Sequence, residues 1–166
     1  MSKKRQLIRI VLLISIIWWM YIIFRFSAQT GSSSASSSHS ILYMIGHISK
    51  HINGHDFITA LSPVQFKFIE FIIRKLAHMF IYFVLSILVL LFLFTYKTKI
   101  FTKIIFSLST SFIYACSDEI HQYFVGGRSA SFKDVLIDTT GATIGILFIM
   151  IIYSIIKVYK KHKAVN

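Results

Sequence analysis

The run LAHMFIYFVLSILVLLFLF, at residues 76–94, decides the fold of this chain. It contains no Lys, Arg, Asp or Glu, and as an α-helix it extends about 28 Å, close to the ~30 Å hydrocarbon layer of a bilayer. Three further mostly apolar stretches reach the same length, at residues 7–26, 104–124 and 135–156. The sequence therefore predicts an all-α membrane protein, a bundle of four transmembrane helices in one domain covering residues 1–166.

The composition excludes several other classes of protein. Charged residues make up 14% of the chain, against about 25% in soluble domains, so a soluble globular protein is excluded. The net charge of +12 comes from basic residues at the ends of apolar runs, which is typical of membrane topology and argues against a nucleic-acid partner. A single cysteine, Cys116, excludes an intrachain disulfide and a CxxC centre.

The distribution of Lys and Arg predicts the orientation of the bundle. Basic residues in short loops stay on the cytoplasmic side of the membrane. The side that holds both termini and the connection at 97–103 carries 11 of the 18 basic residues, and the other side carries 7. We therefore expect both termini inside (N-in/C-in) in a multi-pass protein of the bacterial cytoplasmic membrane. The first stretch exceeds the 7–15 residues of a signal-peptide core, so we interpret it as an uncleaved anchor, with a cleaved signal peptide as the alternative.

Residues 28–70 form the predicted external loop of this topology. The serine run at 32–38 has no apolar surface to bury, so we expect it to be flexible. Residues 41–52 have apolar residues at helical spacing, which predicts an amphipathic helix in the membrane interface that ends at Asn53-Gly54. Pro63 is expected at the start of the second long helix.

Four of the six acidic residues fall within residues 118–138, beside or inside two predicted spans. A carboxylate at mid-membrane costs about 2.5–3.5 kcal/mol on insertion scales, so these groups need partners. In the third span, Asp118, His121 and Gln122 stand at i, i+3 and i+4, which predicts that they share one face. This polar group within an apolar run is the strongest sign of a site in the sequence.

The other two helices bring polar residues to the same predicted external end. In the second helix Arg74 and Lys75 stand one turn before His78, and in the fourth Asp134 and Asp138 stand one turn apart. The glycines at 141 and 145 that follow are interpreted as helix-packing positions. The basic and acidic charges of this end cancel, which predicts a self-neutralised polar pocket open to the outside. These charges are Arg74, Lys75, Arg128, Lys133, Asp118, Glu119, Asp134 and Asp138.

The order and spacing of these residues resemble the VanZ-like family of bacterial membrane proteins across residues 70–148. The resemblance is carried by Arg74-Lys75-Leu-Ala-His78, Asp118-Glu119-Ile-His121-Gln122, Gly126-Gly127-Arg128, Asp134-Val-Leu-Ile-Asp138, Gly141-Ala142 and Gly145. The stretch from Phe26 to Ser32 is also similar to the segment after that family's first span. The resemblance implies a membrane protein linked to resistance to glycopeptide antibiotics, chiefly teicoplanin, and supplies no mechanism.

The sequence supports one main hypothesis for the pocket and one alternative. In the first, the protein binds or modifies an anionic phospholipid or a lipid-linked cell-wall precursor at the outer face of the membrane. General acid and base candidates are Asp118, Glu119, His121 and His78, and substrate-binding candidates are Arg74, Lys75, Gln122, Arg128, Asp134 and Asp138. In the alternative, the polar cluster is non-catalytic and only locks the helices together. Whether the protein is an enzyme, and its oligomeric state, are left open.

We expect no metal and no cofactor from the sequence. The Asp118-Glu119-x-His121 spacing differs from the His-Glu-x-x-His pattern of zinc peptidases, so a metal site that combines these residues with His78 is the less favoured reading. The external histidines at 47, 51 and 55 are interpreted in the same way, because the helix is expected to end before the third.

Overall fold

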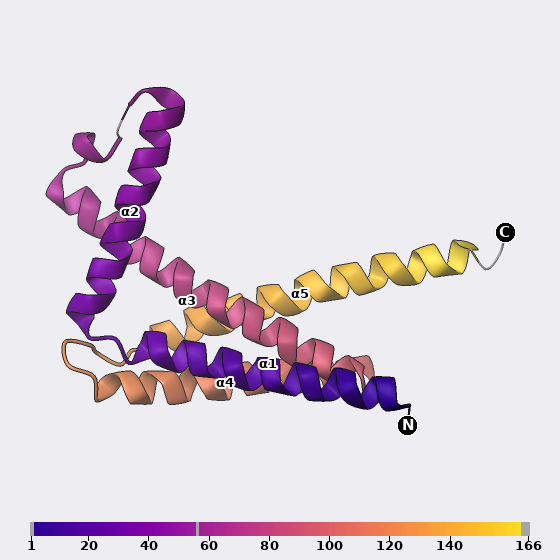
Figure 1. Ribbon diagram of the computed structural model, residues 1–166. Coiled ribbons are helices and arrows are strands. Elements are labelled where there is room, and N and C mark those ends of the chain that lie inside the picture. The colour runs from indigo at the N-terminus through magenta and orange to yellow at the C-terminus, as the bar shows by residue number, and fades with distance from the viewer. Residues whose placement is uncertain (1, 56, 164–166) are drawn as a thin grey trace.

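The computed structural model describes residues 2–55 and 57–163, and within them every regular element is a helix (Figure 1). Four helices are long and apolar enough to cross a membrane, which confirms the prediction of an all-helical, four-span protein. In chain order the elements are α1 (Lys3–Ser27), α2 (Gly31–Asn53), the 3-10 helix η1 (Phe57–Ala60), α3 (Pro63–Phe94), α4 (Ile100–Tyr123) and α5 (Phe132–Lys163).

Helix α3 is the central element, because it packs against α1, α2, α4 and α5. It begins at Pro63, as expected, after a capping box in which the Ser62 hydroxyl accepts from the Gln65 N–H and the Gln65 side chain accepts from the Ser62 N–H. Its 32 residues extend about 48 Å, well beyond the hydrocarbon layer. Residues 63–70, predicted as part of the external loop, are therefore part of the spanning helix.

The expectation of a flexible serine run is wrong, because residues 32–38 belong to helix α2. The Thr30 hydroxyl caps this helix, and the hydroxyls of Ser37 and Ser38 donate to carbonyls four residues earlier in the chain. Ser34 and Ser38 are buried, on a helix that packs against α3. Satisfied hydroxyls and small side chains thus allow close helix packing without an apolar stripe. The predicted end of the helix is confirmed, since Gly54 caps it with a φ of 74°.

Two glycines of α5 set how closely it packs on α3. A Cβ built on Gly141 would lie 2.1 Å from the carbonyl oxygen of Met79, and one on Gly145 would lie 2.4 Å from that of Phe83. The two backbones are therefore in direct contact. The glycine spacing, interpreted as a packing feature, has this role in the structure.

Side-chain hydrogen bonds to main-chain carbonyls hold α1 on the bundle. The Trp19 indole N–H donates to the Ile81 carbonyl at 2.8 Å, and the Tyr114 hydroxyl donates to the Met20 carbonyl at 2.7 Å. Near the N-terminus, Arg9 donates to the side chain and the carbonyl of Thr95. Such bonds connect helices where apolar contacts alone give little specificity in a lipid environment.

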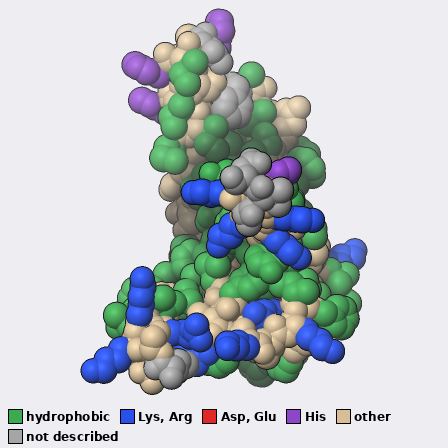
Figure 2. Space-filling model, turned by 90° about the vertical axis from the view of Figure 1, so that its right-hand side faces the viewer, with side chains coloured by type: hydrophobic (Ala, Val, Ile, Leu, Met, Phe, Trp, Pro, Cys, Tyr) green, Lys and Arg blue, Asp and Glu red, His purple; other side chains and the backbone are tan. Residues whose placement is uncertain are grey.

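The two ends of the bundle differ in charge and in connections. Both termini and the α3–α4 connection lie toward one end, and the α1–α2 turn and the α4–α5 loop lie at the other (Figure 1). Figure 2 looks onto the first end, where Lys and Arg side chains gather around the termini. This asymmetry is the one expected if that end faces the cytoplasm.

Replacing Gly141 with Ala tests the contact between α3 and α5. The added Cβ, 2.1 Å from the Met79 carbonyl oxygen, forces the backbones apart, and we expect a loss of about 1–3 kcal/mol of stability. The measurement is thermal unfolding of the purified protein in detergent. Gly126→Ala is the matched control, because its Cβ would meet nothing within 4 Å, and an equal loss in both variants would contradict the packing role.

Cysteine labelling tests the orientation. In a Cys116→Ser background, Ser129→Cys in the α4–α5 loop should react with a membrane-impermeant maleimide in intact cells, because this loop is assigned to the outside. Lys160→Cys near the C-terminus should react only after the cells are lysed. The opposite pattern would invert the topology.

Candidate functional site

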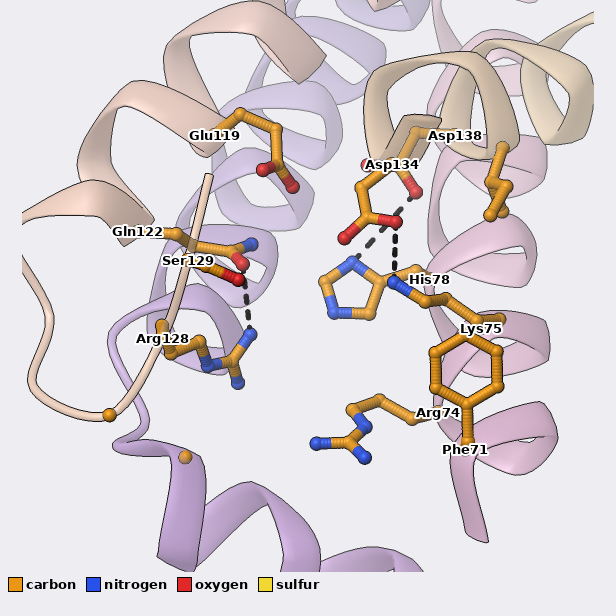
Figure 3. A pocket seen from close by; sticks show the side chains of 13 residues that line it. Phe71, Arg74, Lys75, His78, Glu119, Gln122, Arg128, Ser129, Asp134 and Asp138 are labelled. Carbon is orange, nitrogen blue, oxygen red and sulfur yellow. Dashed lines mark hydrogen bonds and ion pairs between the residues drawn. The ribbon is translucent and has the colours of Figure 1, made fainter. Parts of the chain in front are cut away.

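A polar pocket of about 220 Å³ lies between α3, α4 and α5, at the end of the bundle that holds the α4–α5 loop (Figure 3). Eight of the ten residues proposed from the sequence line it, and Asp118 and His121 do not. The lining residues are Gly31, Phe71, Arg74, Lys75, His78, Glu119, Gln122, Gly127, Arg128, Ser129, Asp134, Ile137 and Asp138. The tertiary structure thus gathers side chains that are up to 107 positions apart in the chain, from Gly31 to Asp138.

A short relay of hydrogen bonds connects the loop arginine to the buried Asp118. The Arg128 guanidinium donates through Nη1 to Oε1 of Gln122 at 3.0 Å, and Gln122 Nε2 donates to Oδ2 of Asp118 at 3.1 Å. Asp118 is only 4% exposed. Gln122 therefore lies between the guanidinium and the carboxylate and orients both.

His121 lies on a different side of α4 from the pocket. Its ring stacks against Phe24 of α1, with the ring centroids 4.6 Å apart. Successive helical residues are about 100° apart, so residues at i+3 and i+4 from Asp118 diverge by about 100° from each other. Gln122 therefore faces the pocket and His121 faces α1. The acid–base role proposed for His121 stays a prediction.

Glu119 is held by the backbone at the start of α5. Its Oε2 accepts a hydrogen bond of 2.8 Å from the Ser131 N–H, and its Oε1 is buried and has no hydrogen-bond partner within the described chain. One carboxylate oxygen thus fixes the α4–α5 loop while the other is available. The sequence offered no signal for the Ser131 contact, because the acceptor and donor meet only in the folded loop.

An ion pair between α3 and α5 borders the pocket. Lys75 Nζ donates to Oδ1 of Asp134, and both side chains are partly exposed. Deeper along the same pair of helices, His78 Nδ1 lies 3.8 Å from Oδ1 of Asp138, a side chain that is 1% exposed. The one-turn spacing in both helices places these two contacts one above the other (Figure 3).

The turn between α1 and α2 positions Arg128. Its Nε donates to the Gln29 carbonyl at 3.0 Å, and the Gly31 N–H donates to the Gly126 carbonyl at 3.3 Å. A Cβ on Gly31 would lie 2.2 Å from the Gly127 carbonyl oxygen, and Gly127 itself has a φ of 75°. Sequence reasoning missed Gln29 and Gly31 as site residues, although their segment was part of the family resemblance.

Arg74 and Arg128 face each other without a carboxylate between them (Figure 3). Within residues 2–55 and 57–163, no hydrogen bond or ion pair joins the Arg74 side chain to another residue. Burial, and then the Arg74 charge, lower the pKa of the Arg128 guanidinium from its ordinary value, although arginine stays protonated in proteins. Two like charges held close together favour a bound anion.

The comparison with known families gives one finding. The model of the family described as VanZ/LLP1 matches residues 12–153, which is most of the chain and includes every residue of the pocket. No curated protein and no solved structure matches the chain.

Replacing Gly31 with Ala tests how the arginine loop is held. The new Cβ, 2.2 Å from the Gly127 carbonyl oxygen, should displace the loop and cost about 1–3 kcal/mol, as overpacking does elsewhere. Hydrogen exchange should become faster in residues 125–131. Ser36→Ala, at an exposed position of the same helix, is the control, and unchanged exchange in the Gly31 variant would refute the contact.

Proposed function

The chain belongs to the VanZ/LLP1 family, and from this membership and the pocket geometry we propose that it binds the phosphate of an anionic phospholipid or lipid-linked cell-wall precursor. The site is the pocket formed by α3, α4 and α5, and it faces the outer leaflet of the bacterial cytoplasmic membrane. The paired cations Arg74 and Arg128 carry the proposal, because a planar guanidinium binds phosphate oxygens in a bidentate manner.

A second cavity favours a lipid, rather than a free phosphate ion, as the ligand of the site. It has a volume of about 100 Å³ and shares Arg74, His78 and Arg128 with the polar pocket. Away from these residues its walls are mostly apolar and include Ile41 of α2 and Ile81 of α3. A polar site that continues into an apolar cleft matches a headgroup with an attached acyl or isoprenoid chain.

The proposed consequence is an influence on susceptibility to glycopeptide antibiotics such as teicoplanin. This follows from the resemblance to the VanZ-like family and from the location of the pocket, because lipid-linked precursors and these antibiotics meet at the outer leaflet. A protein that binds such a lipid there changes how much of it the antibiotic reaches.

Chemical modification of the bound lipid is the extension of this proposal. The unpaired Oε1 of Glu119 and the ring of His78 lie in the pocket with the two arginines, and a carboxylate and an imidazole are suited to general base and acid roles. Asp118 does not line the pocket and acts on it by accepting a hydrogen bond from Gln122, which does.

Neutral variants of the arginines test the binding. Arg74→Gln should weaken the binding of phosphatidylglycerol by about tenfold or more, as expected from losing one charged phosphate contact. Native mass spectrometry and titration in nanodiscs give the affinity. Lys67→Gln is the matched control, since Lys67 is exposed on the same helix outside the pocket. Wild-type affinity in the Arg74 variant would refute the proposal.

The second candidate function is the structural lock. It is favoured by the hydrogen bonds of Arg128 to Gln29 and Gln122, which join the α1–α2 turn to α4. If the lock is the whole role, Arg128→Gln lowers thermal stability, and Arg74→Gln leaves teicoplanin susceptibility unchanged at matched protein levels. Loss of the phenotype in a stably folded Arg74 variant would exclude it.

A further inference from the structure

We propose that His78, Asp118 and Asp138 bind a divalent transition-metal cation beneath the polar pocket, which His78 and Asp138 line and Asp118 adjoins through Gln122. Each residue offers one ligand atom, and these atoms all lie within 4.8 Å of one another. They come from α3, α4 and α5, so the site exists only in the assembled bundle. The proposal goes beyond lipid binding, because none of the three is one of the phosphate-binding arginines.

The charge of this buried site favours a cation. Asp118 and Asp138 are 4% and 1% exposed, and among the described residues no Lys or Arg forms an ion pair with either. The nearest basic groups are engaged elsewhere, since Lys75 pairs with Asp134 and Arg128 donates to Gln122. Two neighbouring carboxylates removed from water are costly unless a proton or a bound cation neutralises them.

The lack of hydrogen bonds to the Asp138 carboxylate is the second observation that supports a metal site. Among the residues that the structure describes, neither of its carboxylate oxygens has a hydrogen-bond partner, although the side chain is almost completely buried. Its one ion-pair contact within the described chain is with the imidazole of His78, at 3.8 Å. A fully buried carboxylate beside an imidazole, with no hydrogen bond, lacks a binding partner. A metal ion is a partner that the carboxylate and the imidazole can both coordinate.

Neighbouring side chains provide the support that metal ligands usually have. Gln122 donates to Oδ2 of Asp118 and orients that carboxylate. Tyr82 is one turn after His78 on α3 and is fully buried, and its hydroxyl has no hydrogen-bond partner in the described part of the chain. That hydroxyl is a donor for a ligating carboxylate or a metal-bound water.

The donor set indicates the class of metal. One imidazole nitrogen and two carboxylate oxygens suit Zn²⁺ or Mn²⁺ better than Mg²⁺ or Ca²⁺, which prefer oxygen donors only. Metal–ligand bonds of about 2.1 Å put tetrahedral ligand atoms roughly 3.4 Å apart, so small side-chain rotations close the observed 4.8 Å spread. Three protein ligands leave coordination positions open, as in catalytic rather than structural sites.

Metal titration of the purified full-length protein tests the inference. After treatment with EDTA, the protein is titrated with Zn²⁺, Mn²⁺ and Mg²⁺, and bound metal is measured by mass spectrometry. We expect about one equivalent of Zn²⁺ or Mn²⁺ and a rise in Tm on binding. Co²⁺ should give visible absorption bands typical of coordination by protein ligands. Binding of none of these ions above a trace overturns the proposal.

Variants localise the bound metal. Asp138→Asn and His78→Ala should each weaken binding by about tenfold or more and remove the Co²⁺ bands. Glu70→Gln is the matched control, because it removes a carboxylate of α3 that pairs with His39 outside the pocket, and it should keep nearly wild-type affinity. Equal losses in Glu70→Gln and Asp138→Asn would show a diffuse acidic attraction and refute the site. If Asp138→Asn does not fold, Asp118→Asn takes its place.

This test is independent of the lipid. Arg74→Gln should retain the metal, because Arg74 is not a ligand. Retained metal with lost phosphatidylglycerol binding supports both proposals, whereas retained lipid binding without any metal refutes only this one.

Discussion

The backbone contact between α5 and α3 is the constraint on which the site depends. Gly141 brings α5 against the carbonyl of Met79, the residue after His78. Asp138 stands three residues before Gly141, and Asp134 stands one turn further back, so the contact places them beside His78 and Lys75. A larger residue at 141 would separate the helices and with them the acidic side of the pocket from the basic side.

A second close approach fixes the position of the loop arginine. Gly31 and Gly127 bring the α1–α2 turn against the α4–α5 loop, and the Gln29 carbonyl accepts from Arg128. The α1–α2 turn therefore contributes to the pocket through backbone atoms. Gly31, which makes this contact, is the first residue of α2. The helical serine run that follows it therefore helps to hold the turn against the α4–α5 loop.

The positive and negative charges of the pocket sum to zero, but they lie on different sides of it. Lys75 and Asp134 neutralise each other at the border, and Glu119 is held by a backbone N–H. Besides Glu119, what is left is a pair of arginines on one side and a pair of buried carboxylates on the other. This separation explains how one small cavity favours both an anion, through Arg74 and Arg128, and a cation, through Asp118 and Asp138.

The sequence by itself determined the spans, the helix ends at Gly54 and Pro63, the glycine packing and most of the pocket residues, because hydrophobic length, capping and one-turn spacing are local properties. It could not determine the helical state of the serine run, which depends on burial against α3. Nor could it separate His121 from Gln122, since residues one apart in the chain face different neighbours only once α1 and α5 are in place. The grouping of His78, Asp118 and Asp138 was likewise decided by tertiary structure, because its three members lie on three helices and no spacing within one helix encodes their distance.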